Sequence, residues 1–243
     1  MKINFGEQFI EKNEPITVYD AAAEAGIISR AVVAAKVNGV VCALTTPITA
    51  DADVTLLTFE DEDGKHVFRH TASHILAQAV KRLYPDAKLA IGPAVDNGFY
   101  YDIDSEVQFT PADLTKIEGE MKKIVKERIK LERSEMPRAE AIAFMESKNE
   151  PYKVELINDL PEGEEISFFK QGDFTELCAG PHVTYTSAVK ALPFTVTAPV
   201  TVRFSTSAKL NAPMSRLQRL HLLIRPTSRR VPVRKSPAAL PRG

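Results

Sequence analysis

Charge is distributed very unevenly along the 243 residues of this chain. All 32 Asp and Glu residues lie at or before Glu176, together with 20 of the 31 Lys and Arg residues, so residues 1–176 carry a net charge of −12. The other 11 Lys and Arg residues fall within residues 177–243, which contain no acid and eight of the 16 Pro. A single evenly mixed domain would not divide its charge in this way. We therefore expect an acidic folded part followed by a basic stretch of different character.

Composition narrows the class of protein. A content of 44% hydrophobic and 26% charged residues is typical of a globular protein, and the length suits one or two domains. Two Cys residues are too few for a disulfide scaffold. The N-terminus carries Asn4, Glu7 and Glu11 instead of an apolar run, and the most apolar stretch, residues 31–44, is too short and polar to span a bilayer. These features favour a cytoplasmic protein with reduced thiols and no membrane contact.

Residues 1–62 are predicted to form a small α+β unit. The Ala-rich stretch 19–28 has Asp20 as a candidate N-cap, which favours a short helix. Asn38-Gly39 is a strong signal for a two-residue hairpin turn. A β-grasp fold fits this order of elements, and so do other α+β units. The expected strands are residues 2–5, 9–16, 32–37, 40–44 and 54–59.

A polar break at residues 61–64 is a candidate domain boundary, and a second α+β region is expected from about residue 66 to residue 190. Apolar residues at helical spacing predict a helix over 71–84, which Pro85 ends. Thr110 followed by Pro111 resembles the start of a capped helix. A third helix is expected from 137 to 145, and strands are expected at 89–95, 99–103, 154–157, 166–169 and 174–178.

Two pairs of residues with catalytic or metal-binding side chains stand out. His70 and His74 are four apart on the predicted helix, so both imidazoles share one face, although such a pair can also be two surface or capping histidines. The segment lacks the Glu that a zinc-protease helix needs. Cys178 and His182 form a second pair in a turn. Together the four side chains could hold one tetrahedral Zn²⁺, or line a hydrolytic pocket without metal. The pairs lie about 100 residues apart, so spacing does not establish that they meet.

Three motifs in order resemble the editing domain of bacterial threonyl-tRNA synthetases: the histidine pair at 70–74, the stretch IGPAVDNGFYYDID at 91–104, and ELCAGPHV at 176–183. Residues 1–62 are similar to the TGS domain that precedes it in those enzymes. The related domain of alanyl-tRNA synthetases shares the two pairs but is not normally preceded by a TGS domain. The resemblance implies an α+β protein: a β-grasp TGS-like domain at 1–62, then an editing domain at 63–191 with an antiparallel sheet and long helices.

The resemblance also implies a function. A site that activates threonine also admits serine, because one missing methyl changes binding by only ~1–3 kcal/mol. A second site then hydrolyses the seryl ester at the 3′ end of tRNA(Thr), without a required cofactor. The chain would be an N-terminal fragment, since no class II catalytic core is visible. ATP-dependent threonylation and the parent's homodimer contacts belong to that missing core. We expect tRNA(Thr) as the partner, and neither DNA nor a membrane.

Roles carry over residue by residue from this resemblance. His70 would orient or deprotonate the attacking water. Lys153 would act on water near the ester if burial lowered its pKa, although a strand lysine in solvent is the simpler interpretation of the residue alone. Tyr100 or Tyr101 would contact the terminal adenosine, and Glu176 replaces a shorter acid that reads the serine amino and hydroxyl groups. The implied catalytic set is His70, His74, Lys153, Cys178 and His182, and the implied substrate-binding set is Tyr100, Tyr101 and Glu176.

The similarity stops near Ala191, and residues 192–243 form a basic, Pro- and Arg-rich stretch without sustained periodicity apart from a short run at Leu217, Leu220 and Leu223. It could be a disordered RNA-binding tail, but we favour the product of a shifted reading frame. The final strands of the editing domain should then be missing, which leaves a sheet edge unpaired. Two other functions remain open: a free-standing trans-editing deacylase, or a non-enzymic tRNA-binding or regulatory TGS module with an inactive editing site.

Overall fold

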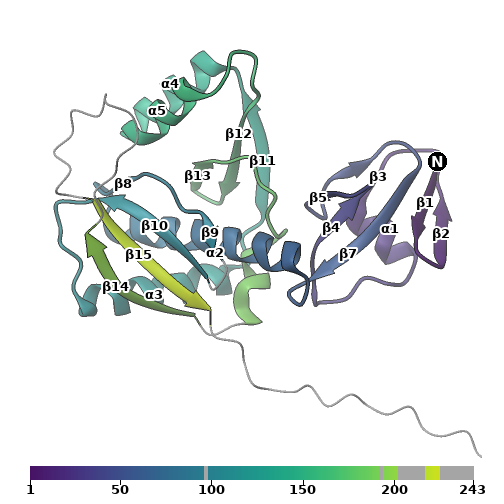
Figure 1. Cartoon of the computed structure of the whole chain (residues 1–243), viewed down its shortest axis with the longest axis horizontal. Coiled ribbons are helices and arrows are strands. Elements are labelled where there is room, and N and C mark those ends of the chain that lie inside the picture. The colour runs from purple at the N-terminus through teal and green to yellow at the C-terminus, as the bar shows by residue number, and fades with distance from the viewer. Residues whose placement is uncertain (96–97, 192–193, 202–216, 225–243) are drawn as a thin grey trace, which may run out of the picture.

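The computed structural model describes residues 1–95, 98–191, 194–201 and 217–224, and Figure 1 shows two α+β units joined by one long helix. The described part contains five α-helices and several small sheets, so the predicted α+β class is confirmed. No helix in the described ranges combines the length and apolar content that crossing a bilayer requires.

The first unit is a mixed five-stranded sheet in the order β2-β1-β7-β4-β5, with helix α1 (Val18–Glu24) packed on it. Thr17 caps α1 by accepting a hydrogen bond from the backbone N–H of Asp20, so Asp20 lies in the first turn and is not itself the cap. Asn38 and Gly39 both have positive φ, which confirms the predicted hairpin. The strands are β1 (Lys2–Phe5), β2 (Gln8–Glu11), β4 (Val32–Val37), β5 (Val40–Cys42) and β7 (Ala52–Thr58), with β3 (Ile16–Thr17) and β6 (Pro47–Ile48) paired beside them.

Helix α2 (Glu62–Leu83) begins at the predicted break, about two and a half turns before the start that the apolar periodicity indicated. The carboxylate of Asp61 accepts hydrogen bonds from the backbone N–H and the hydroxyl of Thr58, at 2.7 and 3.0 Å, which holds the turn between β7 and the helix. A Cβ on Gly64 would lie 1.9 Å from the carbonyl oxygen of Thr58, so the helix can approach the strand this closely only with glycine there. The turn therefore sets the direction in which α2 leaves the first unit.

The second unit is built around α2. Helix α3 (Pro111–Glu127) packs beside α2, and its start is the predicted capping box between Thr110 and Asp113. Both helices contribute to one hydrophobic core with strands β8, β10 and β15 of the sheet β14-β15-β10-β8. Helices α4 and α5 lie at the top of this unit in Figure 1, next to the sheet β11-β12-β13. The remaining elements are β8 (Lys88–Leu89), β9 (Ala94–Val95), β10 (Gly98–Asp104), β11 (Leu131–Met136), α4 (Arg138–Ser147), α5 (Pro151–Asp159), β12 (Ile166–Gln171), β13 (Phe174–Leu177), a 3₁₀ turn at Thr186–Ala191, β14 (Phe194–Thr201) and β15 (Leu217–Ile224).

The prediction of a strand at 154–157 is wrong, because these residues belong to helix α5. Pro151 occupies the first helical turn, where its fixed φ favours a helix and its missing N–H costs nothing. Val154 and Ile157 pack into a small core between α4, α5 and β12. A short apolar run does not distinguish a strand from a segment of buried helix. Lys153 therefore projects from helix α5, which packs against β12.

The prediction that the sheet lacks its final strands is also wrong for the described residues. β15 pairs antiparallel with β10 over seven register positions, from Gly98 opposite Leu223 to Asp104 opposite Leu217, and β14 pairs with β15 in turn. Residues 194–201 and 217–224 thus form strands, contrary to the prediction of a tail from residue 192 onward. The rest of that prediction concerns residues 192–193, 202–216 and 225–243, which lie outside the described part of the chain.

Side chains of β15 make specific contacts with this unit. Arg219 binds the buried carboxylate of Asp102 with two hydrogen bonds, of 2.6 and 2.8 Å, and its guanidinium lies 3.8 Å from the ring centroid of Tyr100. Gln218 accepts a hydrogen bond from the backbone N–H of Phe109 and donates one to the carbonyl of Val107, at 2.8 and 2.7 Å. β15 therefore supplies the positive charge that compensates a buried acid on β10.

Replacement of Arg219 by Leu is expected to lower the free energy of unfolding by about 3 kcal/mol, because Asp102 would keep a buried charge without its partner. Urea denaturation of the full chain followed by circular dichroism would measure this difference. Arg133→Leu is the control, since Arg133 lies on the surface and should change stability by less than about 1 kcal/mol. An equal effect of the two substitutions would contradict the pairing of β15 with β10.

Candidate active site

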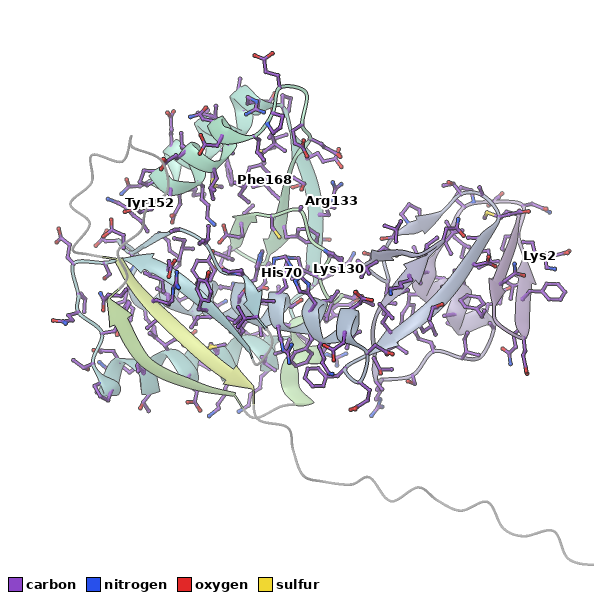
Figure 2. The ribbon with its side chains drawn as sticks, viewed as in Figure 1. Lys2, His70, Lys130, Arg133, Tyr152 and Phe168 are labelled. Carbon is purple, nitrogen blue, oxygen red and sulfur yellow. The ribbon has the colours of Figure 1, made fainter. Side chains whose placement is uncertain are left out.

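The two predicted pairs meet in space. Helix α2 carries His70 and His74 near the centre of the larger unit, where Figure 2 labels His70, and the loop after β13 brings Cys178 and His182 against them. The sulfur of Cys178 lies 3.3 Å from Nε2 of His70 and 3.3 Å from Nε2 of His182. The ring centroid of His182 is 4.3 Å from that of His70 and 4.1 Å from that of His74. A separation of 108 residues in sequence thus becomes direct contact.

The loop that carries Cys178 is held tightly. The backbone N–H of Gly180 donates to the sulfur of Cys178 at 3.2 Å, and the hydroxyl of Ser167 donates to the Cys178 carbonyl at 2.7 Å. Gly180 has a φ of +78°, and a Cβ there would lie 2.7 Å from the ring of Phe169. Glycine is therefore required both by its backbone conformation and by the packing of this ring. The result is a thiol fixed in place beside two imidazoles.

Burial keeps this cluster uncharged at neutral pH. It lowers the pKa of His70 to about 4, with a smaller contribution from the nearby His66, and it lowers the pKa of His74 and His182 well below the ordinary value. Burial also raises the pKa of the Cys178 thiol to about 12. Neutral imidazoles can accept a proton, orient water or bind a metal, so the cluster suits hydrolytic chemistry or metal binding.

The low pKa of His70 predicts a pH dependence of stability. The unfolded chain binds this proton near pH 6.5, whereas the folded chain binds it only near pH 4, so the free energy of unfolding falls as pH drops from about 6.5 to about 4. Each buried histidine of this kind contributes up to about 1.4 kcal/mol per pH unit. We expect His70→Gln to show a shallower loss of stability than the wild type in urea titrations between pH 7 and pH 4.5. The same steepness in both proteins would contradict the burial of a neutral His70.

A cavity of about 380 Å³ opens beside the cluster and is lined on its other side by charged and polar groups. Lys153 forms a buried ion pair with Glu176, with 2.7 Å between Nζ and Oε1. The hydroxyl of Tyr101 donates to the other oxygen of Glu176 at 2.9 Å and lies 3.3 Å from Nζ of Lys153. Burial, reinforced by the Glu176 charge, raises the pKa of Tyr101, so the phenol stays neutral. Lys153, Glu176 and Tyr101 thus form one hydrogen-bonded network on the cavity wall opposite the histidines.

The structure separates the two adjacent tyrosines. Tyr101 lines the cavity, whereas Tyr100 lies on the opposite face of β10, under the guanidinium of Arg219. A Cβ on Gly92 would lie 2.3 Å from the Tyr101 ring, so glycine is needed for the ring to reach Glu176. Six more lining residues belong to the motifs at 91–104 and 176–183, namely Ile91, Gly92, Pro93, Leu177, Ala179 and Gly180. Our sequence reasoning gave no role to Leu156 or to Ser73, which lies one turn after His70 on α2 and could have been found from that spacing.

The donor set fits a zinc ion. The ligand atoms of His70, His74, Cys178 and His182 all lie within 4.8 Å of one another. The ligand atoms of a tetrahedral zinc lie about 3.3–3.7 Å apart for ordinary Zn–N and Zn–S lengths. The four ligand atoms would therefore need to move only slightly closer together to bind one ion. The buried Nδ1 of His74 has no hydrogen-bond partner among the described residues, which is also consistent with a group that is completed by a ligand.

Curated proteins include relatives whose sequences match most of this chain. A threonine–tRNA ligase from Acetivibrio thermocellus is 62% identical over 182 residues, which is 74% of this chain and 29% of that protein. One from Clostridium kluyveri is 61% identical over 184 residues, 75% of this chain and 29% of the relative, and one from Clostridioides difficile is 62% identical over 165 residues, 68% and 26%. No protein-family model matches the chain.

At this level of identity, the matched residues are homologous to part of an aminoacyl-tRNA ligase. The particular ligase is the one specific for threonine, so the predicted resemblance to threonyl-tRNA synthetases is confirmed for about three quarters of the chain. The match spans less than a third of the length of these relatives.

Proposed function

We propose that this chain carries the editing activity of a threonyl-tRNA synthetase and hydrolyses the ester that links serine to tRNA(Thr). Support comes mainly from one observation: a single cavity has neutral imidazoles and a thiol on one wall and a buried Lys–Glu pair on the other. Such a cavity offers a site for water next to groups that can bind an amino acid ester. In this proposal residues 1–62 are the TGS-like domain and residues 63–191 the editing domain.

The proposed reaction is ester hydrolysis by ordered water. The water oxygen attacks the ester carbonyl carbon, its proton passes to an imidazole, and the bond between that carbon and the ribose oxygen breaks. The ribose oxygen takes that proton, the second proton of the water is released to solvent, and serine leaves as a carboxylate. His70 and His74 are the candidates to orient the water, because their imidazoles are neutral and line the cavity. Cys178 contacts His70 and His182 contacts His74, and these contacts hold the two imidazoles in position.

Lys153 and Glu176 would bind the substrate on the opposite wall. The ammonium of Lys153 can donate a hydrogen bond to the carbonyl oxygen as negative charge develops on it. Glu176 uses one oxygen for Lys153 and the other for Tyr101, and a carboxylate retains further lone pairs that can accept from the serine ammonium or hydroxyl. Tyr101, which lines the cavity, is the better placed of the two tyrosines to meet the terminal adenosine.

The partner in this proposal is the 3′ end of tRNA(Thr), in the cytoplasm, without DNA or a membrane. Threonylation with ATP and the homodimer are proposed to belong to the parts of the relatives that this chain does not match. One missing methyl gives the synthetic site only ~10–200-fold discrimination between threonine and serine, which is why a separate hydrolytic step is useful.

A deacylation assay tests the proposal. Purified full chain should release serine from seryl-tRNA(Thr) supplied in solution, much faster than threonine from threonyl-tRNA(Thr), without ATP. Binding of the tRNA without release of serine would overturn the proposed activity and favour the non-enzymic module. Formation of threonyl-tRNA from threonine, ATP and tRNA would contradict the assignment of threonylation to the unmatched parts.

Zinc chemistry is a second candidate because the four ligand atoms lie close together. A zinc ion held by His70, His74, Cys178 and His182 would stabilise the loop after β13 and polarise any water or carbonyl that reached it.

We expect purified protein to hold less than one zinc per ten chains by elemental analysis, and to keep its deacylase activity after chelation. One zinc per chain, lost in parallel with activity on chelation, would replace the metal-free mechanism.

A further inference from the structure

Thr71 follows His70 on α2, is fully buried and makes three close polar contacts through its hydroxyl. The oxygen lies 2.9 Å from the backbone carbonyl oxygen of Val67, one turn earlier on the helix. It lies 3.1 Å from the backbone nitrogen of Val183 and 3.1 Å from Nδ1 of His182. One hydroxyl therefore joins α2 to the loop that completes the histidine cluster.

A count of protons determines the direction of each bond. A hydroxyl has one proton to donate and two lone pairs that accept. Two oxygen atoms 2.9 Å apart need a proton between them, so the Thr71 proton points at the Val67 carbonyl, which cannot donate. The N–H of Val183 can only donate, and it takes one lone pair. The second lone pair then accepts from His182, so Nδ1 of His182 carries the ring proton.

We propose that Thr71 is a positioning residue that holds His182 in the tautomer protonated at Nδ1 and so directs the lone pair of Nε2 at the sulfur of Cys178. Nε2 lies 3.3 Å from that sulfur, so its lone pair can accept the proton of the thiol. The sulfur lone pairs are then free to accept from Gly180 and to face His70. Without the Thr71 hydroxyl, His182 can take its proton at Nε2, where it would oppose the thiol proton.

The tautomer can be measured without any substrate. Thr71→Val keeps the shape of the side chain and removes the hydroxyl, and Thr71→Ser keeps the hydroxyl. In long-range ¹⁵N–¹H spectra of the full chain, His182 should show a protonated Nδ1 in the wild type and in Thr71→Ser, and a shift toward protonated Nε2 in Thr71→Val. A wild-type His182 protonated at Nε2 would overturn the proposal even if the Val variant failed to fold, and so would an unchanged tautomer in a folded Val variant.

The catalytic consequence rests on the proposed function and is tested separately. For hydrolysis of seryl-tRNA(Thr), Thr71→Val should lower kcat at least about tenfold with little change in KM, and Thr71→Ser should restore most of kcat. Equal kcat in all three proteins would overturn the positioning role in the reaction. Absence of hydrolysis by the wild type would refute the proposed function instead, and the ¹⁵N spectra would still decide whether Thr71 sets the tautomer.

Discussion

Replacement of both His70 and His74 by Ala is expected to reduce the hydrolysis of seryl-tRNA(Thr) at least ~100-fold, the lower end of what a positioned base or water-orienting group contributes. The two imidazoles line the cavity from α2, and both are kept neutral by burial. Neutral nitrogen atoms are needed to accept a hydrogen bond from the attacking water. Initial rates with radiolabelled seryl-tRNA(Thr) in excess over enzyme would measure the loss.

His66→Ala is the matched control, because His66 lies on the same helix one turn before His70 and is exposed outside the cavity. It should keep the wild-type rate. The double variant also removes buried volume, so His70→Gln combined with His74→Gln should be assayed beside it, with a urea midpoint for each protein. Turnover that survives in a folded double variant would refute the role of both histidines.

Removal of either member of the buried pair Lys153–Glu176 should lower the free energy of unfolding by about 3–5 kcal/mol, because each single substitution leaves one uncompensated charge in the interior. The side chains are only 5% and 4% exposed, so water cannot take the place of the missing partner. Glu176→Leu should be the worse of the two, since it also removes the acceptor for the Tyr101 hydroxyl. Urea denaturation of the full chain gives both values.

A double-mutant cycle distinguishes the ion pair from simple packing. Lys153→Met combined with Glu176→Leu should be less destabilised than either single variant, because neither charge remains. The exposed pair Glu118–Lys122 on α3 is the control and should show a coupling below about 1 kcal/mol. Additive effects of the Lys153 and Glu176 substitutions would contradict the pair.

All three variants should lose deacylase activity, even where stability is recovered, since both groups line the cavity.

Features set by neighbouring residues were predicted well from the sequence. The hairpin at Asn38-Gly39 and the capping box of Thr110 and Asp113 depend on contacts within three positions, and both are present. Helix α5 was missed, although Pro151 marks its first turn, because a short apolar run fits a strand or a helix equally well. Strand β15 was missed because a seven-position pairing with β10 leaves no mark in local periodicity.

By itself, then, the sequence determined which groups were available for chemistry: two residue pairs with hydrolytic or metal-binding side chains, a lysine, an acid and two tyrosines, in an order that resembles threonyl-tRNA synthetases. Only the tertiary structure decided that the pairs meet, that Lys153 is bound to Glu176, that Tyr101 and not Tyr100 lines the cavity, and that Thr71 joins the cluster. The physical reason is that protonation, pairing and burial depend on neighbours far away in the sequence, which spacing along the chain does not encode.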